Sequence, residues 1–290
     1  LPVPYLDVLS SCCDPRINLP YPTIPSENLY WVGSRVTRPV LNKILAPLFR
    51  YLVHPLVRAR RDAGLPAIRA SLKDVYGEAD FYVYPDMPFL YGEKHAEGAR
   101  FIGPILWSFG DWSEKLDAFE KSGRYTVYIN LGSSGNSGRL SALLEPLVKG
   151  DMNVIISTAG SNHELLKSPF CALENVCIAP YLPSGRLSAM SDIVICNGGT
   201  MSSALALLNG AYCVGLCSNM DQLLNMSLIE QKGLGAMFFD APSSIHKICQ
   251  LISKRPKLDL TQKYTLERSY ATTKPEHEFP AFIEEILGAA

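Results

Sequence analysis

Short apolar segments that alternate with helical segments constrain the fold of this chain of 290 residues more than any other feature. The regular part begins at Tyr125, where the strand-like YTVYINLG precedes the helix-like RLSALLEPLVKG. The alternation continues through NVIIST, HELLKS, NVCIAPYL and GRLSAMS to AMFF and SIHKICQLISK. Brief, continuously apolar strands between helices are typical of a parallel sheet with helices on both faces. The pattern therefore predicts an α/β fold whose strands all end at one edge, where ligands of such folds bind.

A polar turn follows the apolar strand that ends at Cys196. Its residues are the first in the regular part of the chain that indicate a ligand-binding site. Glycines there let the backbone pass close to a bound molecule, and an apolar helix is expected to restart at Ser202. The free N–H groups of a first helical turn favour an anion, and an asparagine amide is a further donor. The candidate anion-binding residues are Asn197, Gly198, Gly199, Thr200, Met201 and Ser202.

Three more loops are expected at the same edge. One pairs a carboxylate with an amide, which suits adjacent sugar hydroxyls, although an isolated Asp-Gln would more commonly cap its helix. Another offers an aromatic wall on which a nucleobase can stack, or a tyrosine that only packs at the surface. The third offers N–H and O–H donors to phosphate oxygens, or forms an ordinary turn. These loops contribute Asp221 and Gln222, then Tyr181, Leu182 and Pro183, and finally Gly132, Ser133 and Ser134.

The part of the chain before Tyr125 is less regular. It is rich in Pro and Tyr at its start, and it contains two strand-like segments, Ala79–Tyr84 and Arg100–Ile105. Leu106–Gly123 lacks periodicity and ends in a glycine, as linkers often do. We therefore expect the remainder of one domain over residues 1–105, a linker over 106–123, a second domain over 124–265 and a helical tail over 266–290.

A basic, amphipathic stretch at Thr37–Ala63 is expected to be helical, with interruptions at Pro47 and Pro55. Its cations lie among Leu, Ile and Phe, so it could contact a membrane surface or an acidic acceptor. The alternative is a helix whose charged face simply lies in water.

Composition excludes several classes of function. The net charge of −1 gives no basic footprint for bulk nucleic-acid binding. The eight cysteines lie mostly in apolar runs without a CxxC pair, which is typical of reduced core residues in a cytoplasmic protein. No apolar run approaches the roughly 20 residues that span a bilayer. The chain begins LPVPYLDV without an initiator methionine, and we expect that a preceding part is missing.

The order NGGTMS, ALALLNG, AYCVGLC and DQLLN resembles the signature of the UDP-glycosyltransferase family with the GT-B fold. NVCIAPYLPS resembles the family's strand that leads to an aromatic-x-Pro step, and RRDAGLP and FIGP resemble the end of its acceptor domain. The resemblance covers about four-fifths of the chain. It implies a Rossmann-like donor domain at the C-terminal side, together with part of a second Rossmann-like domain that binds the acceptor.

For the site, the resemblance implies that Tyr181 and Leu182 lie against a uracil, and that Asp221 and Gln222 hold hexose hydroxyls. Asn197, Met201 and Ser202 would border the diphosphate, with Ser133 and Ser134 helping. The sequence departs from the family at two of these positions. Asn197 replaces a histidine and cannot carry its positive charge, and Met201 is bulky where phosphate approaches closely.

The resemblance also implies a reaction: inverting transfer of a hexose from a UDP-sugar to a small-molecule or lipid-like acceptor, without a metal or other cofactor. None of the five histidines has the context of the family's general base, so we assign no catalytic residue. The alternative is a non-catalytic homologue that binds or activates a partner chain. A sugar-nucleotide epimerase is a weaker reading, because Asp221 is the one candidate acid. A nicotinamide dehydrogenase is weaker still, since GxGxxG follows none of the expected strands.

Overall fold

The computed structural model describes residues 6–8, 51–66, 68, 79–92, 99–132 and 138–289. The chain divides into two compact units. The first comprises Leu1–Pro85 and Glu93–Phe101, and the second comprises Asp86–Gly92 and Ile102–Ala290. The second unit therefore begins at Ile102, before the linker that the sequence suggested, and it also includes the short helix α3 (Pro88–Tyr91).

The first unit contains a three-stranded parallel sheet in the order β1-β2-β3. The strands are β1 (Leu6–Val8), β2 (Phe81–Tyr84) and β3 (Ala99–Phe101). Alternate residues of β2, Tyr82 and Tyr84, are buried and pack with apolar side chains of the same unit. A parallel sheet is what the sequence led us to expect for part of a second α/β domain.

Residues 51–62 of this unit are helical, and Pro55 lies inside the helix instead of interrupting it. Val53 is buried, whereas Tyr51, Leu52 and Leu56 are exposed. Exposed arginines follow in the next turns. Contact of Thr37–Ala63 with a membrane stays a prediction, because residues 37–50 lie outside the described residues. Within the part of the chain that the structure describes, every helix is too short or too polar to cross a bilayer.

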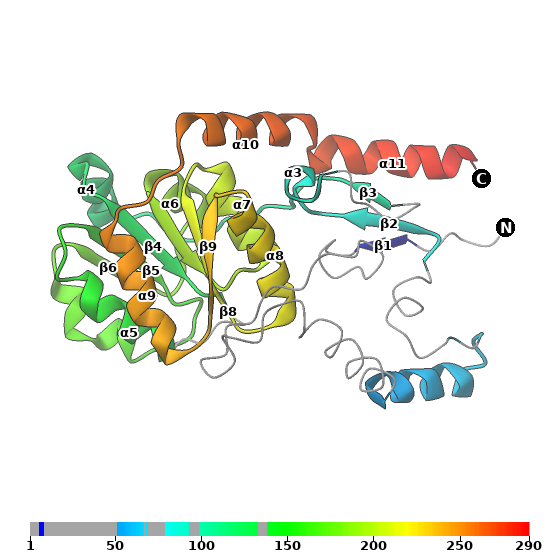
Figure 1. The fold of residues 1–290 in the computed structure, drawn as a ribbon, viewed down its shortest axis with the longest axis horizontal. Coiled ribbons are helices and arrows are strands. Elements are labelled where there is room, and N and C mark those ends of the chain that lie inside the picture. The colour runs from blue at the N-terminus through cyan, green and yellow to red at the C-terminus, as the bar shows by residue number, and fades with distance from the viewer. Residues whose placement is uncertain are drawn as a thin grey trace. The chain divides into compact units, whose positions relative to one another are not determined.

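The second unit is built on a six-stranded parallel sheet, which confirms the predicted architecture (Figure 1). Its strands lie in the order β6-β5-β4-β7-β8-β9. This is the order 3-2-1-4-5-6 of dinucleotide-binding folds, in which the direction of winding reverses between the first and fourth strands. The loops that follow β4 and β7 therefore flank the crevice where such folds bind ligands. The strands are β4 (Thr126–Asn130), β5 (Asn153–Ser157), β6 (Val176–Ala179), β7 (Ile193–Cys196), β8 (Tyr212–Cys217) and β9 (Gly235–Phe239).

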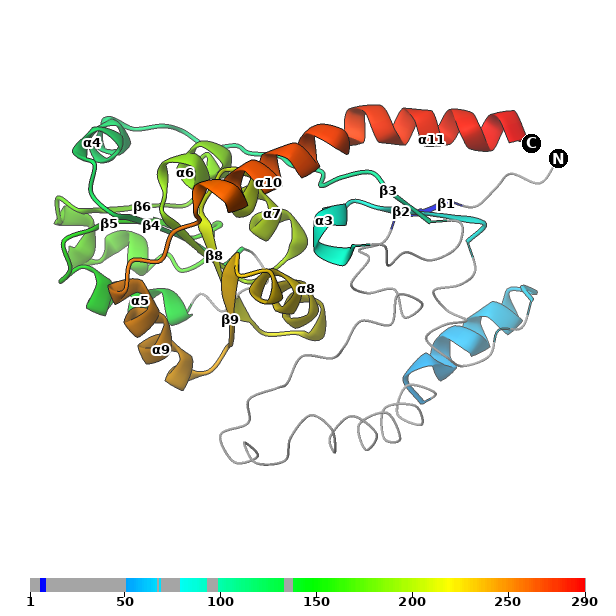
Figure 2. The ribbon, with the colours of Figure 1, turned by 45° about the horizontal axis from the view of Figure 1, so that its top comes forward.

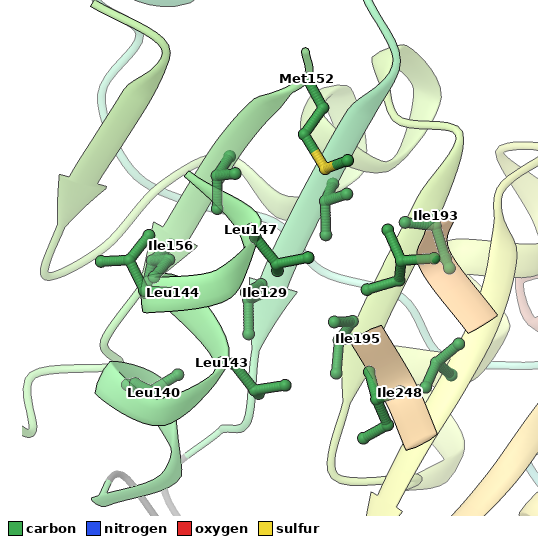
Figure 3. Close-up of a cluster of buried hydrophobic side chains, with 14 of the residues drawn as sticks. Ile129, Leu140, Leu143, Leu144, Leu147, Met152, Ile156, Ile193, Ile195 and Ile248 are labelled. Atoms are coloured by element: carbon green, nitrogen blue, oxygen red, sulfur yellow. The ribbon is translucent and has the colours of Figure 1, made fainter. Parts of the chain in front are cut away.

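Helices cover both faces of this sheet (Figure 2). On one face, leucines of α5 (Gly138–Leu147) and isoleucines of α9 (Pro242–Ser253) pack on alternate strand residues such as Ile129 and Ile195 (Figure 3). The opposite face is covered by α6 (Ser184–Met190) and α7 (Thr200–Leu208), with α8 (Met220–Gln231) beside α7. Strands buried on both sides explain why their sequences are apolar without alternation.

Three local predictions are corrected by the structure. The expected linker contains α4 (Glu114–Ser122), which ends at Gly123 in the left-handed conformation. The expected tail begins inside α10 (Leu260–Thr272), whose start is fixed by a capping box between Asp259 and Gln262. The helix expected at HELLKS is instead a pair of 3₁₀ turns, Leu165–Lys167 and Pro169–Ala172. The chain ends with α11 (Pro275–Ala289), which contains Pro280 inside it.

Candidate functional site

The turn after β7 lies at the point where the strand order reverses, and Gly198 is its tightest position. Its φ is +85°, a region that residues with a Cβ rarely adopt. A Cβ at Gly198 would lie 2.7 Å from Cys217 Sγ and 2.8 Å from Met226 Cγ. Gly199 has a φ of −66° and is the N-cap residue of α7, which begins at Thr200, two residues before the expected start at Ser202. The glycine at 198 is therefore required by both backbone conformation and packing.

Asn225 of α8 holds this turn in place from behind. Its side-chain amide donates to the Gly198 carbonyl oxygen at 2.9 Å and to the Ser203 hydroxyl at 2.8 Å. The Ser203 hydroxyl lies within 3.0 Å of the Gly199 carbonyl oxygen and 3.1 Å of that of Thr200. Asn225 is 1% exposed, so these bonds are shielded from water. The sequence contained a signal for this residue, since it ends the DQLLN motif, but the motif did not indicate that it supports the glycine turn.

The loops after β4 and β7 meet at Asn197. The Asn197 side chain is buried, and its oxygen accepts a hydrogen bond from the Gly199 N–H at 3.1 Å. Its nitrogen lies 3.4 Å from where a Cβ of Gly132 would be. Asn130, the last residue of β4, accepts from the Gly132 N–H at 2.9 Å. Ser133 and Ser134 lie outside the described residues, so their predicted contacts with phosphate stay predictions.

A cavity of about 30 Å³ opens on the α6–α7 side of these two strands. The described residues that line it combine hydroxyl and amide groups with apolar side chains. Met201, Ser202 and Leu205 contribute from α7, and Ser184 contributes from the start of α6. The structure thus brings the start of α7 close to the start of α6. The full lining is Trp107, Tyr128, Asn130, Ser184, Ser188, Val194, Cys196, Met201, Ser202 and Leu205.

Tyr128 forms the polar floor of this cavity. Its hydroxyl lies 3.1 Å from the Ser184 hydroxyl and accepts a hydrogen bond from the Asn130 amide at 3.1 Å. Burial raises the pKa of the Tyr128 phenol, and its hydrogen bonds to neighbouring side chains oppose that shift. The native state therefore keeps this proton to a higher pH than the unfolded chain does.

Replacing Tyr128 by Phe is expected to change how stability depends on pH. The contribution of the protonated phenol is complete below the unfolded pKa of about 10 and is lost as pH rises through the raised native pKa. Urea unfolding should therefore show a free energy that falls less steeply above about pH 10 in the variant, by up to roughly 1.4 kcal/mol per pH unit. Tyr264→Phe, at a position that is 63% exposed, is the matched control. Equal slopes for Tyr128→Phe and the parent chain would contradict this interpretation.

The loop after β6 presents Tyr181 and buries its neighbour. Tyr181 is 47% exposed and Leu182 is 5% exposed, while Pro183 is the N-cap residue of α6. Contact of Tyr181 with a base stays a prediction. Leu182, which the resemblance also placed against the base, is buried and offers little surface to a ligand.

At the start of α8, the structure differs from the alternative in which Asp221 caps the helix. Asn219, and not Asp221, caps the helix, by accepting from the Gln222 N–H at 3.0 Å. Gln222 is buried, and its side-chain oxygen accepts from the N–H and hydroxyl of Ser218 at 2.8 and 3.1 Å. Asp221 is partly exposed in the first turn. The Gln222 oxygen is thus committed to the loop. Contact of Asp221 or Gln222 with sugar hydroxyls stays a prediction.

Metal-ligating residues are not gathered in the described part of the chain. No group of three or more His, Cys, Asp or Glu side chains there is arranged to hold an ion. The cysteines Cys196, Cys213 and Cys217 are buried and free. They pack near Met226 beneath the glycine turn.

Comparison with known proteins relates this fold to sugar transfer. No protein-family model matches the chain. It is 34% identical over 247 residues to the PGL/p-HBAD biosynthesis glycosyltransferase of Mycobacterium tuberculosis, covering 81% of this chain and 54% of that protein. It is 30% identical over 243 residues to the PGL/p-HBAD biosynthesis rhamnosyltransferase of Mycobacterium bovis, covering 81% and 51%. The chain spans about half the length of the curated relatives it matches.

Solved structures agree on the fold. The glycosyltransferase of kitacinnamycin superposes with a TM-score of 0.61 at 15% identity, covering 85% of this chain and 67% of that one. The spinosyn rhamnosyltransferase SpnG, in complex with thymidine diphosphate, superposes with a TM-score of 0.57 at 16% identity, covering 71% and 57%. The parallel sheets, the two mycobacterial relatives and the solved structures lead to one conclusion: over the part that it spans, the chain has the fold of GT-B glycosyltransferases and is similar to them in sequence.

Proposed function

We propose that this chain carries the donor site of an enzyme that transfers a hexose from a nucleotide sugar to a small-molecule or lipid-like acceptor. The observation that carries the proposal is the glycine turn at the switch point, where the start of α7 and the loop after β4 converge on Asn197. Backbone N–H groups at the start of a helix suit a diphosphate. A UDP-sugar is the favoured donor from the sequence, and the thymidine diphosphate bound by SpnG brings dTDP-sugars into the test.

The proposed reaction is a displacement with inversion. A general base activates the acceptor hydroxyl, which attacks the anomeric carbon as the bond to the diphosphate breaks. The N–H groups at Thr200, Met201 and Ser202 would stabilise the negative charge that develops on the leaving diphosphate. Asp221 would accept hydrogen bonds from hydroxyls of the hexose. The base is not assigned to a residue of this chain.

Titration calorimetry tests the donor site directly. We expect the chain to bind at least one of UDP and UDP-glucose, and at least one of dTDP and dTDP-rhamnose. The affinity should be the same with and without EDTA. No heat with any of the four at millimolar concentration would contradict the proposal. Binding that EDTA abolishes and Mg²⁺ restores would contradict metal independence alone.

Asp221→Asn separates the sugar contact from the diphosphate contact. The isosteric amide loses the charged acceptor, so affinity for the nucleotide sugar should fall by roughly 1.5–3 kcal/mol while affinity for the free nucleoside diphosphate stays the same. The same calorimetric titrations measure both values. An equal loss for sugar nucleotide and diphosphate would show that Asp221 acts on the fold of the turn and does not contact the hexose.

A further inference from the structure

A basic surface lies where the strands of the six-stranded sheet begin, at the edge opposite the candidate site. Arg124, two residues before β4, has its Nε 3.6 Å from the carboxylate of Asp151, which lies two residues before β5. Arg255 follows α9 and donates from its guanidinium to the Asp151 carbonyl oxygen at 3.1 Å. Lys257 Nζ lies 2.6 Å from the carboxylate of Asp192, directly before β7. Cations from separate parts of the chain are therefore gathered at one edge.

Tyr125 holds the last two of these cations in place. The centroid of its buried ring lies 5.8 Å from the Arg255 guanidinium carbon and 5.5 Å from the Lys257 nitrogen, within the range of cation–π attraction. Its hydroxyl donates to the carbonyl oxygen of Pro256, between them in the chain, at 2.8 Å. Arg255 has a φ of +51°, a conformation that favours glycine at the end of a helix. The fold therefore keeps an arginine at a strained position and fixes its side chain.

Three exposed lysines add to this charge. Lys121, Lys149 and Lys254 each lie within three residues of a residue in these contacts, and none of them has a carboxylate partner among the described residues. Asp259 follows nearby, but its carboxylate caps α10. The chain as a whole has a net charge of −1, so positive charge is concentrated here. We call this surface the basic edge, and it consists of Lys121, Arg124, Lys149, Lys254, Arg255 and Lys257.

The exposure of these side chains indicates the kind of anion that they suit. The side chains of Arg124 and Lys257 are 53% and 59% exposed, although both are in ion pairs. The cations come from three separate segments of the chain. A small anion is bound where donors converge in a concave site, whereas exposed cations spread along an edge suit an extended anionic surface.

Two exposed apolar side chains follow the basic edge in the chain. Leu260 and Tyr264, one turn apart at the start of α10, are 86% and 63% exposed, and no other large apolar side chain in the described part of the chain is as exposed as Leu260. Leu260 is three residues from Lys257, at most about 11 Å along the chain. Cations beside a leucine and a tyrosine are typical of proteins that lie on a membrane, because charge attracts the headgroups and the apolar side chains enter the boundary beneath them. A stable protein interface would need a larger apolar centre.

We propose that the basic edge, with Leu260 and Tyr264, binds the surface of a lipid bilayer that contains anionic lipids. The chain would then act at a membrane without spanning it, and the candidate donor site would lie at the opposite edge of the same sheet. The proposal is independent of the donor site, and it names a surface other than Thr37–Ala63.

Co-sedimentation with vesicles tests the proposal on the full chain. The chain should bind vesicles of phosphatidylcholine with about one-third phosphatidylserine and not vesicles of phosphatidylcholine alone, and binding should weaken between about 0.1 and 0.5 M salt. Each cation near such a surface contributes roughly fivefold in affinity, so Lys149→Glu with Lys254→Glu should weaken binding by roughly 25-fold or more. Arg58→Glu with Arg61→Glu makes the same change of charge on the other candidate surface and should stay within about threefold of the parent chain. Urea unfolding checks that both variants are folded.

The apolar contact and the alternative partner have tests of their own. Leu260→Ser should weaken vesicle binding by roughly three- to tenfold, whereas Leu287→Ser at the end of α11 should not change it. Polyglutamate stands for an acidic protein partner. Failure of the parent chain to bind anionic vesicles, with or without binding of polyglutamate, would overturn the proposal. Parent-level vesicle binding by the Lys149 and Lys254 double variant would overturn it too, as would an equal loss in both double variants, which would show a response to net charge alone.

Discussion

Replacing Gly198 by alanine is expected to lower the free energy of unfolding by about 2–4 kcal/mol and to abolish nucleotide binding. A residue with a Cβ at this left-handed φ costs roughly 1–2 kcal/mol in backbone strain. The methyl group would also press on Cys217 Sγ and Met226 Cγ, both closer than 3.0 Å, and overpacking typically costs a further 1–3 kcal/mol or so. The turn can relieve both terms only by moving away from α8, which would displace the N–H groups at the start of α7.

Gly199→Ala is the matched control in the same turn. Gly199 has an ordinary φ, and a Cβ there would approach only the Asn197 side-chain oxygen, at 3.3 Å. We expect a change in stability below about 1 kcal/mol. Urea unfolding of both variants, with UDP titration of each folded protein, measures the two effects. If both alanines destabilise the chain equally, the left-handed turn is not the constraint that the structure indicates.

Replacing Asn225 by alanine should lower stability by about 2–3 kcal/mol. The change leaves the Gly198 carbonyl without its donor in a buried place, and an unsatisfied buried acceptor costs about 1–3 kcal/mol. Removal of the side chain also leaves a small cavity between α8 and the turn. Nucleotide affinity should fall as well, although Asn225 lies behind the turn, because the turn that presents the α7 N–H groups loses its support.

Ser203→Ala separates the two hydrogen bonds of Asn225. It removes the bond between Asn225 and the Ser203 hydroxyl and preserves the one to Gly198. Its cost should be about 1 kcal/mol, with nucleotide affinity nearly unchanged. Urea unfolding and calorimetry on both variants provide the comparison. Loss of affinity in Ser203→Ala as large as in Asn225→Ala would show that the Gly198 bond is not the decisive one.

Local chemistry made most of the second unit predictable. The strands from β4 to β9 are runs of apolar residues, which can be identified from local sequence alone. The glycine turn can be identified in the same way. Errors occurred where local signals were weak. In the segment 106–123 the sequence showed no helical periodicity, because only two side chains of α4, Leu116 and Phe119, are buried. At HELLKS a single 3₁₀ turn, Leu165–Lys167, ends at Ser168, and Pro169 begins a second one before a regular helix is established.

The candidate site was predictable in part for the same reason. Asn197, Gly198 and Gly199 belong to one turn, so their proximity follows from the chain itself. Asn225 could be noticed in DQLLN, but its role depends on a bond across 27 positions to the Gly198 carbonyl. Gln222 and Asp221 looked equivalent in the sequence. They differ in the fold because the Gln222 side chain is buried and accepts hydrogen bonds from Ser218, whereas Asp221 is partly exposed.

The sequence by itself determined the α/β class, the order of strands and helices along the chain, and the glycine turn after Cys196, because periodicity and turn chemistry act between near neighbours. Only the tertiary structure decided which strands lie side by side. The order β6-β5-β4-β7-β8-β9 places the loops after Asn130 and Cys196 together at the reversal point. It also brings Trp107 and Phe109 beside Tyr181, which follows them by about 70 residues. Such pairings are set by how buried faces fit across the whole unit, and no short stretch of sequence contains that information.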